Sequence, residues 1–196
     1  MLSEIVQEWN EANATSTEAA TEGKDVPMED EEKKEQLMSL VKRIVPCQMQ
    51  NHAEAESCDL LIEVERLDLL EEYVDKQAHK RVCLYLTSCV PYVPEPENTN
   101  LLHAALKLFR KFKEYPQALR LALQINDPKL VMEIFVGCED PVMQKQLAFM
   151  LGSHHHFLEL DEEQYEEIIE IISNRSDHYL NFLLLKSKTK CNKHQQ

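Results

Sequence analysis

The sequence feature that most constrains the fold is residues 80–98, where an apolar segment runs directly into a proline-rich one. If the first half is helical, apolar residues surround it almost completely: Val82, Cys83, Leu84, Tyr85, Leu86, Cys89 and Val90. A helix without a polar face is stable only when other elements surround it. Pro91, Pro94 and Pro96 then prevent the helix from continuing and favour an extended chain. The segment therefore predicts a buried helix followed by a stiff connector, in the middle of a stacked helical domain.

The rest of the chain is also predicted to be helical. Its 196 residues include only three glycines, whereas leucine, glutamate, alanine and lysine, which favour helices, are plentiful. This length is sufficient for one domain with a hydrophobic core and a flexible tail. The sequence has no apolar run of about 18 residues, so we expect no membrane span. It also lacks a basic region and an apolar signal core at its N-terminus, so we do not expect secretion.

Charge and cysteine usage narrow the functional classes further. The net charge of −14 argues against binding nucleic acid or anionic membranes by bulk electrostatics. The six cysteines include no Cys-x-x-Cys pair. We therefore predict reduced thiols in a protein of the cytoplasm and nucleus.

Two different segments are predicted before residue 35. Residues 1–13 are predicted to form a short amphipathic helix, whose apolar face consists of Leu2, Ile5, Val6 and Trp9. Residues 14–34 contain mostly Thr, Ser, Glu, Asp and Lys, together with Gly23 and Pro27. Because so few apolar residues cannot offset the entropic cost of ordering, we predict a disordered acidic linker. A regulatory interaction tail is the alternative interpretation of this segment.

Residues 35–185 are predicted to form a domain of helical hairpins, followed by a polar basic tail at residues 186–196. Pro116, Pro128 and Pro141 fall at nearly regular intervals along this domain. Short helices joined by short turns and repeated in this way are typical of antiparallel hairpins stacked in an α-solenoid. The repeat is shorter than the tetratricopeptide or HEAT period, so neither of those families is assigned.

Several helix boundaries can be predicted from single residues. Asp127 and Asp140 each precede a proline, and an aspartate N-cap followed by proline is a strong helix start. Asp75 is predicted to cap the buried helix. Gly137 and Gly152 lie where two of the later helices are expected to end, which is the usual position of a C-terminal cap.

The sequence predicts no catalytic, cofactor or metal site. His154, His155 and His156 are consecutive, whereas metal ligands on a helix are three or four residues apart, so we expect a solvated loop there. A row of carboxylates is expected to cover one exposed helix face: Glu162, Glu163, Glu166, Glu167 and Glu170. The isolated glycines exclude a phosphate-binding loop, and no Cys–His pair can be located from spacing. We therefore predict that the chain is not an enzyme.

Basic residues between Lys107 and Lys113 form one further candidate surface. They are expected to lie together on the polar face of the helix that follows the proline-rich connector. Such a face can bind an acidic partner, although most charged faces are simply solvated. The sequence leaves both interpretations open.

Several stretches of the chain carry a specific family resemblance. They are residues 40–46 (Leu-Val-Lys-Arg-Ile-Val-Pro), 51–54 (Asn-His-Ala-Glu), 58–61 (Cys-Asp-Leu-Leu), 82–90 (Val-Cys-Leu-Tyr-Leu-Thr-Ser-Cys-Val), 92–98 (Tyr-Val-Pro-Glu-Pro-Glu-Asn), 109–112 (Phe-Arg-Lys-Phe), 118–123 (Ala-Leu-Arg-Leu-Ala-Leu), 144–146 (Gln-Lys-Gln), 148–152 (Ala-Phe-Met-Leu-Gly) and 157–160 (Phe-Leu-Glu-Leu). Collinear matches of this length, in connectors as well as helices, do not arise from helical periodicity alone. Over residues 37–173 the chain resembles the N-terminal helical region of the non-ATPase regulatory subunit 2 family of the 26S proteasome.

This resemblance implies a non-catalytic scaffold without a cofactor, located in the base of the proteasome regulatory particle. Such a subunit supports ubiquitin-dependent protein degradation through contacts with other base subunits, including the ATPases. The family's receptor surfaces for ubiquitin and shuttle factors are understood to lie on a ring of repeats. We expect that ring to be missing from this chain, so no receptor residue is assigned. A truncated relative that is not incorporated into proteasomes and a generic α-solenoid adaptor are the alternatives.

Overall fold

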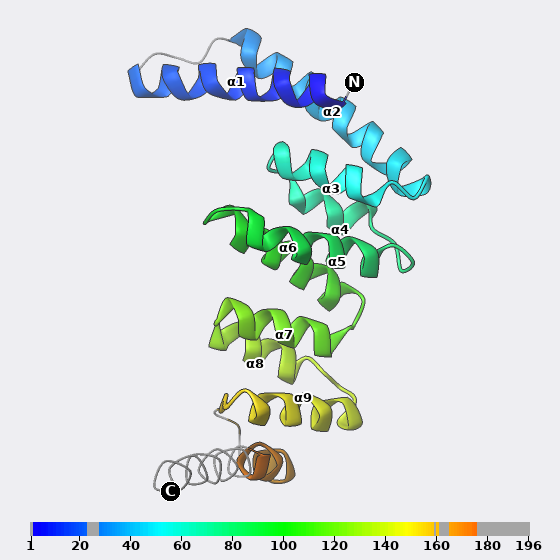
Figure 1. Ribbon diagram of the computed structural model, residues 1–196, viewed down its shortest axis with the longest axis vertical. Coiled ribbons are helices and arrows are strands. Elements are labelled where there is room, and N and C mark those ends of the chain that lie inside the picture. The colour runs from blue at the N-terminus through cyan, green and yellow to red at the C-terminus, as the bar shows by residue number, and fades with distance from the viewer. Residues whose placement is uncertain (1, 23–27, 159, 161–164, 176–196) are drawn as a thin grey trace, which may run out of the picture. The chain divides into compact units, whose positions relative to one another are not determined.

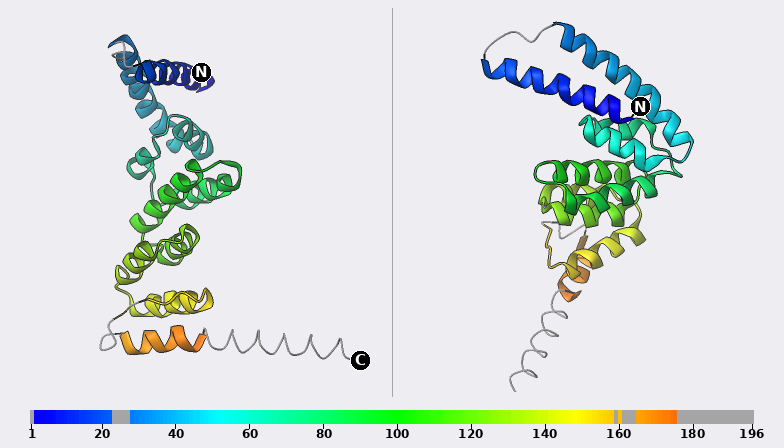
Figure 2. Two further views of the ribbon diagram at one scale, coloured as in Figure 1. Left: turned by 90° about the vertical axis from the view of Figure 1, so that its left-hand side faces the viewer. Right: turned by 45° about the horizontal axis from the view of Figure 1, so that its top comes forward.

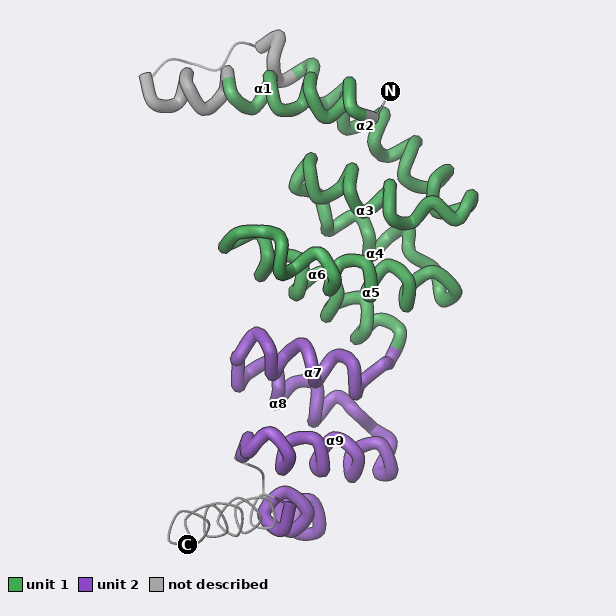
Figure 3. The backbone as a smooth tube through the Cα atoms, in the orientation of Figure 1, with its two compact units in different colours: residues 1–112 green, residues 113–196 purple. Residues whose placement is uncertain are grey.

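Helices account for all the regular secondary structure that the computed structural model describes, which covers residues 2–22, 28–158, 160 and 165–175 (Figure 1). This confirms the predicted all-α class. The chain divides into two compact units, residues 1–112 and residues 113–196 (Figure 3). Helices joined by short connections pack against each other within each unit, as in an α-solenoid.

The first unit contains most of the helices. They are α1 (Leu2–Glu22), α2 (Met28–Gln50), α3 (Glu54–Glu63), the 3-10 helix η1 (Leu67–Leu69), α4 (Leu70–Tyr73), α5 (His79–Cys89), the 3-10 helix η2 (Val90–Tyr92) and α6 (Glu97–Lys111). In this unit α1 packs against α2 (Figure 2), α2 against α3, and α5 against both α3 and α6. Its core is aliphatic, and the side chains with at most 2% exposure include Val41, Val45, Leu61, Leu70, Leu86, Leu101, Leu106 and Leu108.

Helix α5 is the apolar helix predicted from the sequence, and it is buried on one side only. Val82, Cys83 and Leu86 are fully buried, which confirms its central position in the first unit. Leu84 is 70% exposed, so the prediction that other elements surround the helix is wrong for that side. The reason is that the helices packed against α5 cover only the side that carries the three buried residues.

The proline-rich connector joins the two helices of one hairpin. It begins as the 3-10 turn η2 and becomes extended at Val93, before α6 starts at Glu97. Helices α5 and α6 pack closely against each other on either side of it. The N-cap of α5 is Ala78, so the prediction that Asp75 caps this helix is wrong. Asp75 instead closes the turn just before α5, where its Oδ1 accepts hydrogen bonds from the backbone N–H groups of Gln77 (2.8 Å) and Ala78 (2.7 Å).

Two helices extend into the segment predicted to be a disordered linker. Helix α1 runs to Glu22 instead of ending near residue 13, and α2 begins at Met28. The sequence before Gly23 is rich in alanine and glutamate and lacks glycine and proline, so its helix propensity is high despite its few apolar residues. The predicted linker is therefore corrected for residues 14–22 and 28–34. Residues 23–27 and the predicted tail at 186–196 lie outside the described residues.

The second unit contains α7 (Tyr115–Ile125), α8 (Pro128–Val136) and α9 (Pro141–Ser153), and residues 165–175 are also helical. Helix α7 packs against α8 and α9. The core side chains of this unit include Leu119, Val131, Ile134, Phe135, Leu147 and Leu151, each at most 1% exposed. Ile168 and Ile172 are buried on one side of the helical segment at residues 165–175.

The predicted helix boundaries in the second unit are confirmed with one exception. Asp127 accepts a hydrogen bond from the backbone of Lys129 (2.9 Å), and Asp140 accepts one from Val142 (3.0 Å). Gly137 is the residue that caps the end of α8. Gly152 is not a cap, because α9 continues through it to Ser153. A different constraint requires glycine at this position: the backbone carbonyl of Ile172 approaches it closely.

Candidate functional site

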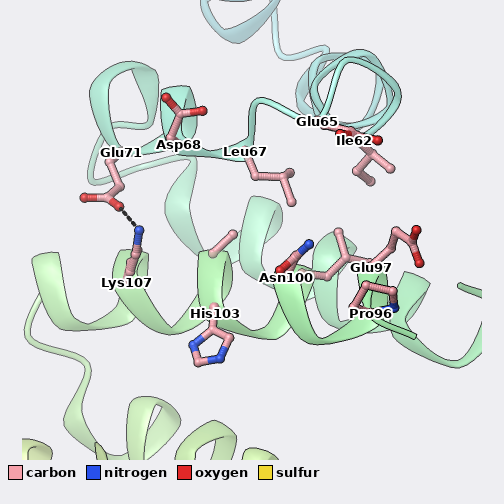
Figure 4. Close-up of a pocket in the computed structure, with 12 residues that line it drawn as sticks. Ile62, Glu65, Leu67, Asp68, Glu71, Pro96, Glu97, Asn100, His103 and Lys107 are labelled. Carbon is pink, nitrogen blue, oxygen red and sulfur yellow. Dashed lines mark ion pairs between the residues drawn. The ribbon is translucent and has the colours of Figure 1, made fainter. Parts of the chain in front are cut away.

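A groove in the first unit is the main candidate for a functional site. It lies between η1 and α4 on one side and α6 on the other, and has a volume of about 440 Å³ (Figure 4). Four of its lining residues are apolar: Ile62, Leu67, Leu101 and Ala104. Its polar lining residues are Glu65, Asp68, Glu71, Glu97, Asn100, His103 and Lys107, and Pro96 completes the lining.

Local sequence features place both walls of the groove. After α3 the chain turns at Glu65, which has a φ of 55°, in the left-handed region used at helix C-termini. This turn leads into η1, where the Leu67 side chain points toward α6 across the groove and the Asp68 carboxylate points away from α6 (Figure 4). On the opposite wall, the proline-rich connector ends at Pro96 and α6 begins at once. The connector predicted to be stiff therefore fixes where the α6 wall starts.

The groove carries more negative than positive charge. At one end Lys107 reaches across from α6, with its Nζ 3.3 Å from Glu71 Oε1 (Figure 4). The guanidinium of Arg66 donates two hydrogen bonds of 2.8 Å to Asp68 and thereby lowers the pKa of that carboxyl. Glu65 and Glu97 have no ion-pair partner in the part of the chain that the structure describes. The second end of the groove thus presents two uncompensated carboxylates.

Part of the basic face at residues 107–113 forms contacts within the first unit. Besides the pairing of Lys107, the ammonium group of Lys111 donates hydrogen bonds to the backbone carbonyls of Glu71 and Val74 at the end of α4. A cation at a helix C-terminus is favourable because the last carbonyls lack intrahelical partners. Two of the lysines that were candidates for binding an acidic partner therefore help to hold α4 against α6.

An ion pair between the buried Glu54 and the exposed Arg81 joins α3 to α5. Glu54 is only 7% exposed, and the guanidinium of Arg81 donates to its Oε1 from two nitrogens, Nε at 3.1 Å and Nη2. This interaction lowers the pKa of the Glu54 carboxyl more than its burial raises it. Sequence reasoning missed the pair, because the two residues lie 27 positions apart and neither belongs to a recognisable motif.

The lowered pKa of Glu54 predicts a dependence of stability on pH. A carboxyl whose pKa is lower in the folded state stabilises the fold above its unfolded pKa, which is about 4.3 for glutamate. This contribution is lost as the pH falls through the lower folded pKa. We therefore expect Glu54→Gln to reduce the free energy of unfolding by about 1–2 kcal/mol at neutral pH, and by much less in strong acid. Urea unfolding at both pH values measures the difference.

The control for this experiment is Glu56→Gln, which removes an exposed carboxylate from the same helix. We expect this variant to match the wild-type chain within about 0.5 kcal/mol at both pH values. A loss of stability at Glu54 that is equally large in acid and at neutral pH would contradict the assigned role of the charge.

The described cysteines favour structural over catalytic roles. Cys47, Cys58, Cys83, Cys89 and Cys138 are free thiols. Burial raises the pKa of both Cys58 and Cys83 to about 12, so these groups stay protonated and weakly nucleophilic near neutral pH. The arrangement agrees with the prediction of reduced thiols, while Cys191 lies outside the described residues.

The histidine triplet lies at the end of α9. His154 is the residue that caps the helix and, like His155, its side chain is exposed. Among the described residues, no three histidine, cysteine or acidic side chains lie close enough together to hold a metal ion. Of the predicted row of carboxylates, Glu166, Glu167 and Glu170 are exposed, and Glu167 pairs with Lys145. Glu162 and Glu163 lie outside the described residues.

None of the helices in the described part of the chain is both long and apolar enough to cross a membrane.

Comparison with curated proteins identifies relatives of the chain. It is 40% identical over 160 residues to the 26S proteasome non-ATPase regulatory subunit 2 of Dictyostelium discoideum, a match that covers 80% of this chain and 18% of the relative. It is also 40% identical over 152 residues to homolog A of the same subunit from Arabidopsis thaliana, covering 74% of this chain and 17% of the relative. The 26S proteasome regulatory subunit RPN1 of Candida glabrata is 32% identical over 182 residues, a match that covers 92% of this chain and 18% of the relative. The chain therefore spans less than a fifth of the length of these relatives.

The match to a protein family is more extensive than the match to any of these relatives. The model of the RPN1 N-terminal domain matches residues 1–186 and thus spans the whole first unit and most of the second. This agrees with the resemblance seen in the connector and in the helices on both sides of it. The chain belongs to the family of the RPN1 N-terminal domain.

Proposed function

We propose that the chain is a non-catalytic scaffold module of the 26S proteasome regulatory particle base, which supports ubiquitin-dependent protein degradation through protein–protein contacts. The observation that carries this proposal is the match of the RPN1 N-terminal domain to residues 1–186. The relatives of the chain are regulatory subunits of the 26S proteasome. A stack of short helices suits such a role, because it presents long surfaces to partner proteins.

The proposed partners are the other subunits of the regulatory particle base, including its ATPase subunits, and the proposed location is the cytoplasm and nucleus. The chain needs no cofactor for this role. The chain contributes surfaces to which other subunits bind. The buried thiols and the ion pairs described above stabilise the helices that carry these surfaces. The proposed role includes no recognition of ubiquitin or shuttle factors by the residues described above.

The test is co-purification from cells. An affinity-tagged copy of the chain is expressed at low level, regulatory particles are isolated through a different subunit, and the tag is quantified in the particle fraction. We expect the chain to elute with the particle and to remain bound at physiological salt. Its absence from purified particles, with free chain accumulating in the lysate, would reject the proposal in favour of a relative that is not incorporated. Recovery with a different assembly would instead favour a generic adaptor.

A further inference from the structure

We propose that the groove between η1–α4 and α6 binds a basic, amphipathic helical segment of another protein chain. The premise that the chain acts through protein contacts rests on the proposed function, whereas the choice of segment rests on the groove itself. Its α6 wall extends from Glu97 to Lys107, a length of about 15 Å at the rise of an α-helix. This length matches about three turns of a bound helix.

The apolar lining of the groove explains why the segment must be amphipathic. Ile62 and Leu67 are half-buried and remain partly open to solvent on one wall. Leu101 and Ala104, at 1% and 9% exposure, form the base of the other wall. A partner helix with apolar residues spaced three or four positions apart can place them over Ile62 and Leu67 and remove these two side chains from water.

The charge of the groove determines the sign of the charge that the partner must carry. Glu65 and Glu97 come from opposite walls near the same end, while the Glu71–Lys107 ion pair occupies the other end (Figure 4). A purely apolar helix would desolvate the two carboxylates without compensating them, which is unfavourable. Arginine or lysine residues in the bound segment can pair with these carboxylates. We therefore expect the basic end of the segment to lie at Glu65 and Glu97.

The same charges disfavour other classes of ligand. Nucleic acids and acidic peptides would bring more negative charge to a groove that already has an excess of it, on a chain with a net charge of −14. Pairing of an extended peptide with a sheet edge requires a strand, and the described residues form none. Docking of an amphipathic helix is the mode that the apolar and acidic lining of the groove fits.

Fluorescence anisotropy with the full chain tests this inference at physiological salt. The probe is an end-capped fluorescent peptide of about four helical turns, built from alanine and glutamine, with leucines at i, i+4 and i+7 and arginines in its first turn. We expect saturable binding. Glu65→Gln combined with Glu97→Gln should weaken binding by about tenfold or more. A probe with glutamates in place of arginines should not bind measurably.

The matched control combines Glu63→Gln with Glu72→Gln. These two exposed glutamates also belong to the first unit, but they do not line the groove, and their removal changes the net charge by the same amount. We expect this control to bind the probe within about twofold of the wild-type chain. Asn100→Trp places a large side chain on the exposed wall of α6 and should weaken binding without changing the helical circular dichroism spectrum.

Three outcomes would overturn the inference. They are failure of the wild-type chain to bind the probe, an equal loss of binding in both double variants, and unaltered binding by the Asn100 variant. An equal loss in the double variants would mean that the overall charge of the chain attracts the peptide. The proposed function can be judged separately. Co-purification without probe binding rejects only the proposal that the groove binds a helix. Probe binding without co-purification rejects only the proposed role in the proteasome.

Discussion

Replacing Phe135 with alanine should reduce the free energy of unfolding of the second unit by about 3–5 kcal/mol. Its ring is fully buried and is the largest side chain in that core. It also meets Tyr165 edge-on, with ring centroids 6.1 Å apart and planes inclined by 61°. The substitution removes both the buried apolar area and this aromatic contact, and leaves a cavity between α8 and the helical segment at residues 165–175. Urea unfolding followed by circular dichroism measures the loss.

Phe149→Ala is the matched control, because it makes the same chemical change on the outside of the second unit. The Phe149 ring is 51% exposed, and the guanidinium of Arg175 lies 4.4 Å from its centroid. An exposed cation–π contact contributes about 0.5–1 kcal/mol, so we expect a correspondingly small loss of stability. Losses of similar size in the two variants would contradict the assigned position of Phe135 at the centre of the core.

Local signals in the sequence predicted helix boundaries well, because a cap depends on only a few neighbouring residues. Asp127 and Asp140 accept the backbone hydrogen bonds expected of N-caps, whereas Asp75 accepts its hydrogen bonds in the turn before α5, three residues ahead of the actual N-cap Ala78. Tertiary packing was harder to predict from the sequence. The apolar residues of α5 predicted its central position, but the exposure of Leu84 depends on which side α3 and α6 cover. Which side of α5 is covered depends on residues that lie far from α5 in the sequence.

The groove could not have been predicted from the sequence for the same reason. Leu67 and Leu101 belong to different elements, and only the packing of η1 and α4 against α6 brings them to one surface. The acidic end of the groove likewise combines Glu65, which follows α3, with Glu97, which starts α6. The one local signal was the proline-rich connector, because it fixes the start of the α6 wall. Family resemblance, by contrast, could be recognised from short collinear stretches without any knowledge of packing.

Gly152 was assigned the wrong role from the sequence, and its actual environment predicts a large effect of a small substitution. A Cβ atom at this position would lie 2.8 Å from the backbone carbonyl oxygen of Ile172 and 2.8 Å from Arg175 Cβ. Gly→Ala inside a helix normally adds about 0.5–1 kcal/mol of stability, because alanine has the higher helix propensity. Here the neighbouring segment must move instead, since a backbone carbonyl cannot rotate away as the end of a side chain can.

We therefore expect Gly152→Ala to destabilise the second unit by about 1–3 kcal/mol, opposite in sign to its effect on helix propensity. The movement should also loosen residues 165–175, so trypsin should cleave faster after Arg175, whose Nε now donates a hydrogen bond to Ser153 Oγ (3.1 Å). Gln146→Ala, on an exposed position of the same helix, should change neither the stability nor the cleavage rate appreciably. A more stable Gly152→Ala variant would show that α9 and this segment are not in such close contact. The glycine would then have to be explained by something other than packing.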